Sequence, residues 1–177
     1  MKVQPSILVI QLFQDLKYGK KEQEMKMKEK KILEQIKELA KSKMKREDIL
    51  KETVRILKEN FPPEAGYNWV GIYLLEGEEL ALGPFSGKPS PHTRIRLNSG
   101  ICGAAASQKK SIIIPDVKSD PRYLACSLET KSEIVVPIMT REEVWGEIDI
   151  DSDRLDAFTE EDKHLLEEVC SILAELF

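Results

Sequence analysis

The residues that could do chemistry lie mostly in the second half of the chain. Two thiols occur there, Cys102 in Gly-Ile-Cys-Gly and Cys126 in Leu-Ala-Cys-Ser. Three carboxylates accompany them, Glu133, Asp149 and Asp151. A thiolate is a strong nucleophile, and a neighbouring carboxylic acid can give a proton to a leaving group. The stretch is therefore suited to a reduction in which a cysteine becomes a sulfenic acid and a second thiol then restores it.

Spacing places several carboxylates on one face of a predicted strand. Asp149 and Asp151 are two residues apart, so their side chains share a face with Glu147. Ile148 and Ile150 would point the other way, into the core. Because clustered carboxyl groups cannot all ionise at low cost, at least one pKa should rise. A carboxylic acid that stays neutral near pH 7 would be a suitable proton donor.

Two aromatic residues in another predicted strand could complete a binding pocket. Trp69 and Tyr73 are four residues apart and therefore also share a face. Aromatic rings that flank a small apolar group, with acids at the polar end, would suit an amino-acid ligand.

Each of these residues also has an ordinary interpretation. Acids on an edge strand usually form a solvated face, and aromatic residues in strands usually serve packing. Cys102 lies among Gly and Ala, a composition typical of close packing. Cys126 lies in a polar loop, where packing is a less natural explanation. Cys170, beside Val169 on the predicted last helix, is expected to be structural.

Composition indicates one domain and narrows the function classes. The chain has 177 residues, 41% hydrophobic and 33% charged, which allows a real core. Residues 1–58 hold 16 basic and 9 acidic residues, a net charge of +7, whereas residues 59–177 hold 11 and 22, a net charge of −11. An acidic globular part argues against a nucleic-acid groove. Three cysteines without a CxxC or a Cys/His cluster predict neither a disulfide framework nor a metal cofactor.

The same features predict a cytoplasmic protein with no membrane partner. The apolar run at residues 7–13 is too short to span a bilayer, and no cleavage-site pattern follows it. Cysteines that are not arranged for disulfides fit a reducing compartment. We expect no cofactor.

Periodicity predicts an α+β fold, with helices flanking a mostly antiparallel sheet. Residues 5–18 are ambiguous between strand and short helix, and residues 20–29 suggest a linker or an exposed helix start. Two helices are expected before residue 60, and their length makes a homodimer the expectation. The remaining predicted elements are strands at 69–75, 80–85, 94–97, 111–114, 134–139 and 144–150, a short helix at 101–108 and a final helix at 160–177.

Taken together, the motifs resemble a known family. The pieces that carry the resemblance are Asn68-Trp-Val-Gly-Ile-Tyr73, Leu82-Gly-Pro-Phe-Ser-Gly-Lys88, Gly100-Ile-Cys-Gly103, Pro115-Asp-Val117, Ala125-Cys126, Ser132-Glu-Ile-Val-Val-Pro137 and Gly146-Glu-Ile-Asp-Ile-Asp-Ser152. In this order they are similar to GAF domains, and more narrowly to the GAF-fold free methionine-(R)-sulfoxide reductases. The resemblance covers roughly residues 60–177. It implies a GAF (PAS-like) fold, which we place at residues 31–177 after an N-terminal extension at residues 1–30.

The resemblance implies a reaction and roles for particular residues. The reaction is reduction of free L-methionine (R)-sulfoxide to methionine, usually with thioredoxin as the recycling reductant. By motif, Cys126 would attack the sulfoxide sulfur. The sulfoxide oxygen and the substrate amine would be held by the acids Glu133, Asp149 and Asp151. The substrate methyl group would be walled by Trp69 and Tyr73.

One position departs from the family pattern. His92 stands where the family typically has a further cysteine that can resolve the oxidised enzyme. Three hypotheses follow: Cys102 resolves Cys126, an external thiol reduces Cys126 directly, or His92 lowers the pKa of Cys126. Two other functions also remain open. One is a non-catalytic GAF sensor for an amino-acid-like ligand, and the other is a redox switch without turnover.

Overall fold

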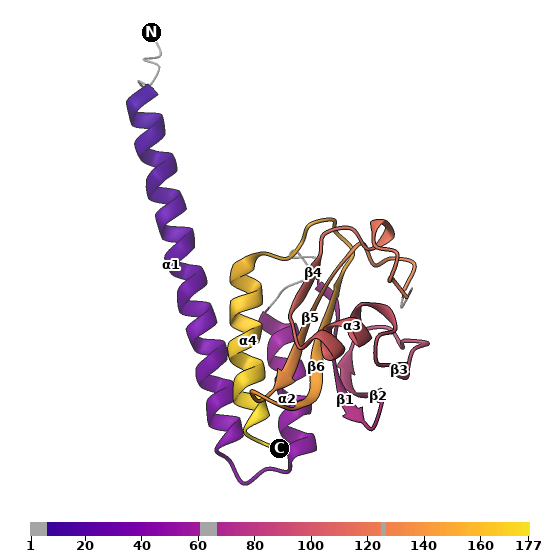
Figure 1. Cartoon of the computed structure of the whole chain (residues 1–177). Helices are drawn as coiled ribbons and strands as arrows, with labels where there is room; N and C mark the ends of the chain where they lie inside the picture. The colour runs from indigo at the N-terminus through magenta and orange to yellow at the C-terminus, as the bar shows by residue number, and fades with distance from the viewer. Residues whose placement is uncertain (1–6, 61–66, 125–126) are drawn as a thin grey trace.

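A six-stranded antiparallel sheet forms the centre of the part of the chain described by this computed structural model, residues 7–60, 67–124 and 127–177 (Figure 1). Its strand order is β3-β2-β1-β6-β5-β4. The strands are β1 (Tyr67–Glu76), β2 (Glu79–Ser86), β3 (Arg94–Arg96), β4 (Ile112–Ile114), β5 (Ser132–Met139) and β6 (Val144–Ser152). The α+β class predicted from the sequence is confirmed.

Helices cover the two faces of this sheet unequally. Three of them, α1 (Ile7–Ala40), α2 (Arg46–Asn60) and α4 (Glu160–Ala174), lie on one side and enclose an apolar core with the sheet (Figure 1). The opposite side carries the short helix α3 (Gly100–Gln108) and a single 3-10 turn at Val117–Ser119. The site described below lies on the α3 side.

Strand β6 lies between β1 and β5, and residues packed on either side of the sheet bury both of its faces. Ile148 and Ile150 are fully buried on the side of the three helices, as their alternation predicts. Asp149 and Asp151 on the other side are only 2% and 3% exposed. The ordinary interpretation of these acids as a solvated edge face is therefore wrong, because β6 is a central strand.

The N-terminal segment is one long helix, which corrects the sequence-based expectation. Residues 20–29 lie inside α1 and form neither a linker nor a helix start, and residues 7–18 are helical as well. Lys, Glu and Gln are good helix formers, so a polar stretch can continue a helix without an apolar face of its own. Ile32 and Ile36 are buried against the domain. The N-terminal half of α1 projects clear of it (Figure 1).

The other predicted helices are confirmed. α2 begins at Arg46 with acidic residues in its first turn, which suits the positive end of the helix dipole. α4 begins after Thr159, whose side chain accepts from the Asp162 amide while Asp162 accepts from the Thr159 amide, a reciprocal cap. Within the described ranges, every helix is too short or too polar to cross a bilayer.

Candidate active site

The register of three neighbouring strands arranges side chains in rows on the α3 face of the sheet. Each row contains one residue from β1, one from β6 and one from β5. In the order β1, β6, β5, the rows are Trp69–Asp151–Glu133, Gly71–Asp149–Val135 and Tyr73–Glu147–Pro137. Four carboxyl groups are thereby gathered on one buried surface, although Glu133 is distant in sequence from the acids of β6.

Cys102 on α3 contacts this carboxyl cluster. Its Sγ lies 3.7 Å from Oε1 of Glu133 and 3.6 Å from Oδ2 of Asp149, and the thiol is 3% exposed. On the neighbouring side, α3 packs closely against the end of β3 because Gly103 has no side chain. A Cβ there would lie 2.3 Å from the carbonyl oxygen of Arg96. The structure therefore brings one predicted thiol together with two predicted acids.

Burial makes the carboxyl groups hard to ionise. The pKa values of Glu133, Glu147 and Asp149 rise well above their ordinary range, first because the groups are buried and then because neighbouring carboxylates repel a second charge. Burial also raises the pKa of Asp151 from 3.8 to about 7. Neutral acids are thus present near pH 7, which is the condition that proton donation requires.

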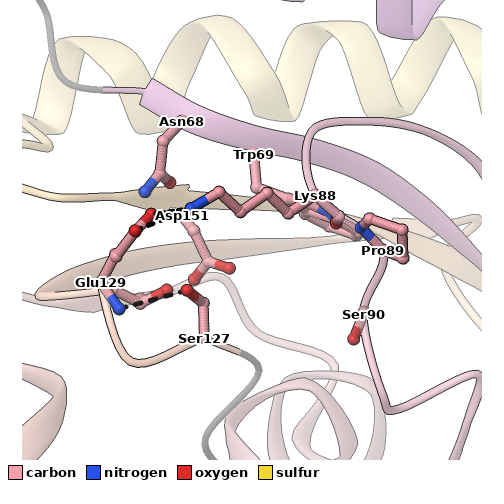
Figure 2. Close-up of a pocket in the computed structure, with 9 residues that line it drawn as sticks. Asn68, Trp69, Lys88, Pro89, Ser90, Ser127, Glu129 and Asp151 are labelled. Carbon is pink, nitrogen blue, oxygen red and sulfur yellow. Dashed lines mark hydrogen bonds and ion pairs between the residues drawn. The ribbon is translucent and has the colours of Figure 1, made fainter.

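A small pocket opens at the first of these rows (Figure 2). Its volume is about 180 Å³, below the roughly 300–1,000 Å³ of pockets for drug-sized ligands. The lining residues are Asn68, Trp69, Lys88, Pro89, Ser90, Ser127, Glu129, Thr130 and Asp151. A ligand of amino-acid size fits such a volume, and Asp151 is the member of the buried carboxyl cluster that lines it.

The family of this chain follows from comparison with known proteins. The GAF domain family matches residues 45–176. The chain belongs to the GAF domain family. Within that family it is grouped with the free methionine-R-sulfoxide reductases by sequence and by structure.

Named relatives show how close that grouping is. The chain is 44% identical over 118 residues to GAF domain-containing protein A of Dictyostelium discoideum, an alignment that covers 66% of this chain and 72% of the relative. It is 43% identical over 110 residues to the free methionine-R-sulfoxide reductase of Saccharomyces cerevisiae, covering 60% and 61%. It is 38% identical over 109 residues to the Escherichia coli protein of the same name, an alignment that covers 62% of this chain and 66% of the relative. The match thus spans roughly two thirds of these relatives.

Solved structures extend the likeness to the fold. The type II free methionine-R-sulfoxide reductase of Thermoplasma acidophilum aligns with a TM-score of 0.70 at 40% identity, over 80% of this chain and 94% of that one. The Neisseria meningitidis enzyme, solved in complex with its substrate, aligns with a TM-score of 0.78 at 35% identity. That alignment covers 84% of this chain and 87% of the Neisseria chain.

In this GAF domain, Trp69 is held firmly over the pocket floor. Its Nε1 donates to the carbonyl oxygen of Lys88 at 3.0 Å, and its ring stacks on Phe85 with centroids 5.8 Å apart. The indole lies over Gly71, where a Cβ would come within 2.1 Å of the ring. Glycine at this strand position therefore leaves the space that the indole occupies.

Tyr73 lies deeper than Trp69, with the two ring centroids 6.3 Å apart. It is fully buried, and its hydroxyl donates to the carbonyl oxygen of His92 at 2.9 Å. The structure thus places Tyr73 beneath Trp69, outside the residues that line the pocket. His92 contributes its backbone to this arrangement and ties the loop after β2 to the sheet.

The predicted nucleophile, Cys126, lies outside the described residues, so its distance from Cys102 or His92 is not described either. The next residue, Ser127, lines the pocket. Cys170 lies on the other side of the sheet, where its Sγ is 3.4 Å from the carbonyl oxygen of Val136 within the apolar core.

Sequence reasoning assigned no role to three residues of this region. Lys88 and Glu129 form an ion pair at 2.7 Å across the pocket, as Figure 2 shows. They are 41 residues apart and both lie in loops, where periodicity gives no signal. Glu147 was placed on the correct face without a role. It is fully buried, and within the described part of the chain neither of its carboxyl oxygens has a hydrogen-bond partner.

Proposed function

We propose that this GAF domain reduces free L-methionine (R)-sulfoxide to L-methionine. The observation that carries the proposal is the buried cluster of Cys102 with Glu133 and Asp149 next to a pocket of amino-acid size. Structures of relatives named free methionine-R-sulfoxide reductase, two of them solved with substrate, support the same reaction. The alignments cover roughly two thirds of the length of the named relatives. The reaction proposed for this chain is therefore argued from the residues of its own site.

The pocket offers a partner for each end of the substrate. The acids Glu133, Asp149 and Asp151 would hold the sulfoxide oxygen and the ammonium group. Trp69 would cover the methyl group, because its ring is fixed by Phe85 and Lys88. The carboxylate of the substrate needs a cation, and Lys88 is the basic side chain among the residues that line the pocket. Lys88 would exchange its ion pair with Glu129 for the substrate.

The chemistry balances with one thiol and one proton. The thiolate of Cys126 attacks the sulfoxide sulfur, and the S–O bond breaks as the oxygen passes to the cysteine with a proton from a neutral carboxylic acid. The substrate sulfur gains two electrons, the cysteine sulfur loses two, and Cys126 becomes a sulfenic acid. A neutral acid is available near pH 7 because burial raises the pKa of Asp151 to about 7, and burial raises the pKa values of Glu133 and Asp149 as well. Cys126 is assigned by motif.

The surroundings of Cys102 favour recycling by an external thiol. Cys102 is 3% exposed, and two carboxyl groups lie within 3.7 Å of its Sγ. Reactive thiolates usually have cationic neighbours, so Cys102 is poorly placed to act as a resolving nucleophile. A thioredoxin-type dithiol, attacking the Cys126 sulfenic acid or its mixed disulfide, would then complete the cycle. Mass spectrometry of substrate-oxidised protein tests this, since an internal Cys102–Cys126 disulfide would contradict it.

The deciding experiment follows consumption of methionine (R)-sulfoxide, with the (S) form as the stereochemical control, using dithiothreitol and separately thioredoxin. We expect turnover of the (R) form alone. Cys126→Ser should abolish turnover, whereas Cys170→Ser, which changes a thiol on the other face, should not. If the (R) form binds but neither reductant supports turnover, the chain is instead a ligand-binding GAF sensor. In that case Cys126→Ser leaves ligand affinity unchanged.

We also propose that the chain forms a homodimer through α1. The N-terminal half of α1 projects clear of the domain (Figure 1), and Met25 and Met27 on this helix are 49% and 74% exposed. A second copy would shield these apolar residues from water. Light scattering of the full chain, beside a variant with Met25→Lys and Met27→Lys, measures the mass directly. A monomeric unmodified chain at high concentration would contradict the proposal.

A further inference from the structure

We propose that Cys102, Glu133 and Asp149 form a binding site for a divalent cation of the zinc class. The proposal goes beyond the reductase activity, because it concerns a ligand that the reaction does not require. It rests on the positions of three ligand atoms, on their burial and on oxygen atoms that have no partner.

The three ligand atoms have the separations that zinc needs. The Sγ of Cys102 and one oxygen from each of Glu133 and Asp149 all lie within 4.8 Å of one another. The sulfur-to-oxygen distances are 3.7 and 3.6 Å. In a tetrahedral site with Zn–S of about 2.3 Å and Zn–O of about 2.0 Å, sulfur and oxygen lie about 3.5 Å apart. The two sulfur-to-oxygen distances are therefore close to those of a zinc site, and the two oxygens, at most 4.8 Å apart, would draw together around the ion.

Unpartnered buried oxygens point to a missing cation. Asp149 is 2% exposed, and its Oδ1 has no hydrogen-bond partner among the residues that the structure describes. The same holds for Oδ1 of Asp151 and for both oxygens of Glu147. An unpaired buried carboxyl group is costly, and a bound cation is one of the few ways to compensate several of them at once. Among the described residues, no Lys, Arg or His forms a salt bridge with any of these three acids or with Glu133.

The donor set selects the class of metal. A cysteine sulfur is a soft ligand that favours Zn²⁺ and similar ions over Mg²⁺ and Ca²⁺, which prefer oxygen ligands alone. Three protein ligands leave a fourth position for water, as in zinc sites with an open position. The fixed register of β5 and β6 and the close approach of α3 preorganise all three ligands.

The metal site would overlap the substrate site. This part rests on the proposed function, in which Glu133 and Asp149 hold groups of the sulfoxide. A bound ion would use the same oxygens, so zinc and substrate should exclude each other. Zinc would then act as an inhibitor of the reductase.

Cobalt provides a direct test that needs no turnover. We expect the full-length reduced chain to bind one Co²⁺ and to show a thiolate-to-cobalt charge-transfer absorption in the near ultraviolet. Cys102→Ala should remove the absorption and weaken Zn²⁺ binding, measured by calorimetry, at least tenfold. Cys170→Ala, which removes an equally buried thiol from the other face, should change neither. Mg²⁺ should not bind at this site.

The outcomes separate the metal site from the reductase. Absorption that persists in Cys102→Ala and disappears in Cys126→Ser would overturn the proposal, as would the absence of saturable Co²⁺ or Zn²⁺ binding in an active enzyme. Asp149→Asn provides a second variant if Cys102→Ala does not fold, and it should also weaken Zn²⁺ binding. Metal binding without turnover would support the metal site and contradict the proposed reductase activity. A zinc affinity unchanged by saturating sulfoxide would overturn the overlap.

Discussion

The two faces of β6 are buried to the same degree and have opposite chemistry. On the side of the three helices, Ile148 and Ile150 are fully buried in the apolar core. On the α3 side, Glu147 is fully buried, and Asp149 and Asp151 are 2% and 3% exposed. One strand thus serves as core on one face and as a candidate active site on the other.

The comparison shows where the domain gains stability and where it loses it. Each fully buried isoleucine contributes about 1.5–3 kcal/mol relative to an exposed one. A buried carboxyl group without a hydrogen-bond partner costs free energy instead, which is tolerable only because the opposite face of the sheet offsets it. Two buried cysteines repeat the pattern. Cys170 lies in the apolar core, whereas Cys102 contacts two carboxyl groups.

Of the changes to β6, the largest effect on activity should come from replacing an acid of the site. We expect Asp149→Asn to lower kcat/KM for methionine (R)-sulfoxide by about 10³-fold, within the range of 10²–10⁴ for a lost general acid. The melting temperature should not fall, because the change removes a buried ionisable group. Exposed Asp153, just after β6, provides the control, since Asp153→Asn should leave kcat/KM unchanged. If Asp149→Asn lowers kcat/KM threefold or less, the α3 face of β6 is not the face that carries the chemistry.

The opposite face should respond in stability and not in chemistry. Ile148→Ala removes a fully buried side chain beside the acids and should cost about 3 kcal/mol, or roughly 6–12 °C in melting temperature. The kcat of the protein that remains folded should be unchanged, because the side chain points away from the pocket. Thermal unfolding and kinetics measured well below the melting temperature test both statements. A large loss of kcat in folded protein would mean that the faces are coupled.

The pH dependence of stability should carry the signature of Asp151. Its folded pKa of about 7 exceeds the ordinary value of 3.8, so the folded state holds the proton more tightly. The free energy of unfolding contributed by this group should therefore fall as pH rises from about 4 to about 7 and stay low above that. Asp151→Asn should remove the fall and raise stability at pH 8 by about 2 kcal/mol, half of the upper limit of about 4 kcal/mol for the full shift.

Denaturant unfolding across this pH range is the measurement, with Asp153→Asn as the control for a surface carboxylate. If the free energy of unfolding of Asp151→Asn falls with pH as steeply as that of the unmodified protein, other groups cause the pH dependence. The other acids of the cluster, Glu133, Glu147 and Asp149, would be the first to test.

The smallest effect should sharpen the account of the pocket itself. Lys88→Met removes the cation proposed for the substrate carboxylate and should raise KM about tenfold, or about 1.4 kcal/mol, with kcat little changed. Lys51→Met, which alters an exposed lysine on α2, is the matched control. A lowered kcat with an unchanged KM would show that Lys88 acts on the chemistry and not on binding. The exposed ion pair with Glu129 should add little to stability.

Local patterns predicted much of the fold and one side of the site. Alternation along β6 indicated which residues share a face, and the structure confirms that Ile148 and Ile150 enter the core. The final helix was also predicted correctly, with its start at Glu160. The family motifs placed the chain among GAF domains, which the comparisons confirm. The roles of Cys126 and of the three substrate-binding acids stay predictions, as does a domain boundary at residue 30.

By itself, then, the sequence determined the period of each element, the face on which each side chain lies and the family, because these are encoded by neighbouring residues. Only the tertiary structure decided what covers each face. It made β6 a central strand, brought Cys102 between Glu133 and Asp149, and joined Lys88 to Glu129 across the pocket. It also showed that α1 continues through the polar residues 20–29, where the sequence pattern had predicted a linker or a helix start. Such contacts depend on strand order and loop path, which local periodicity does not contain.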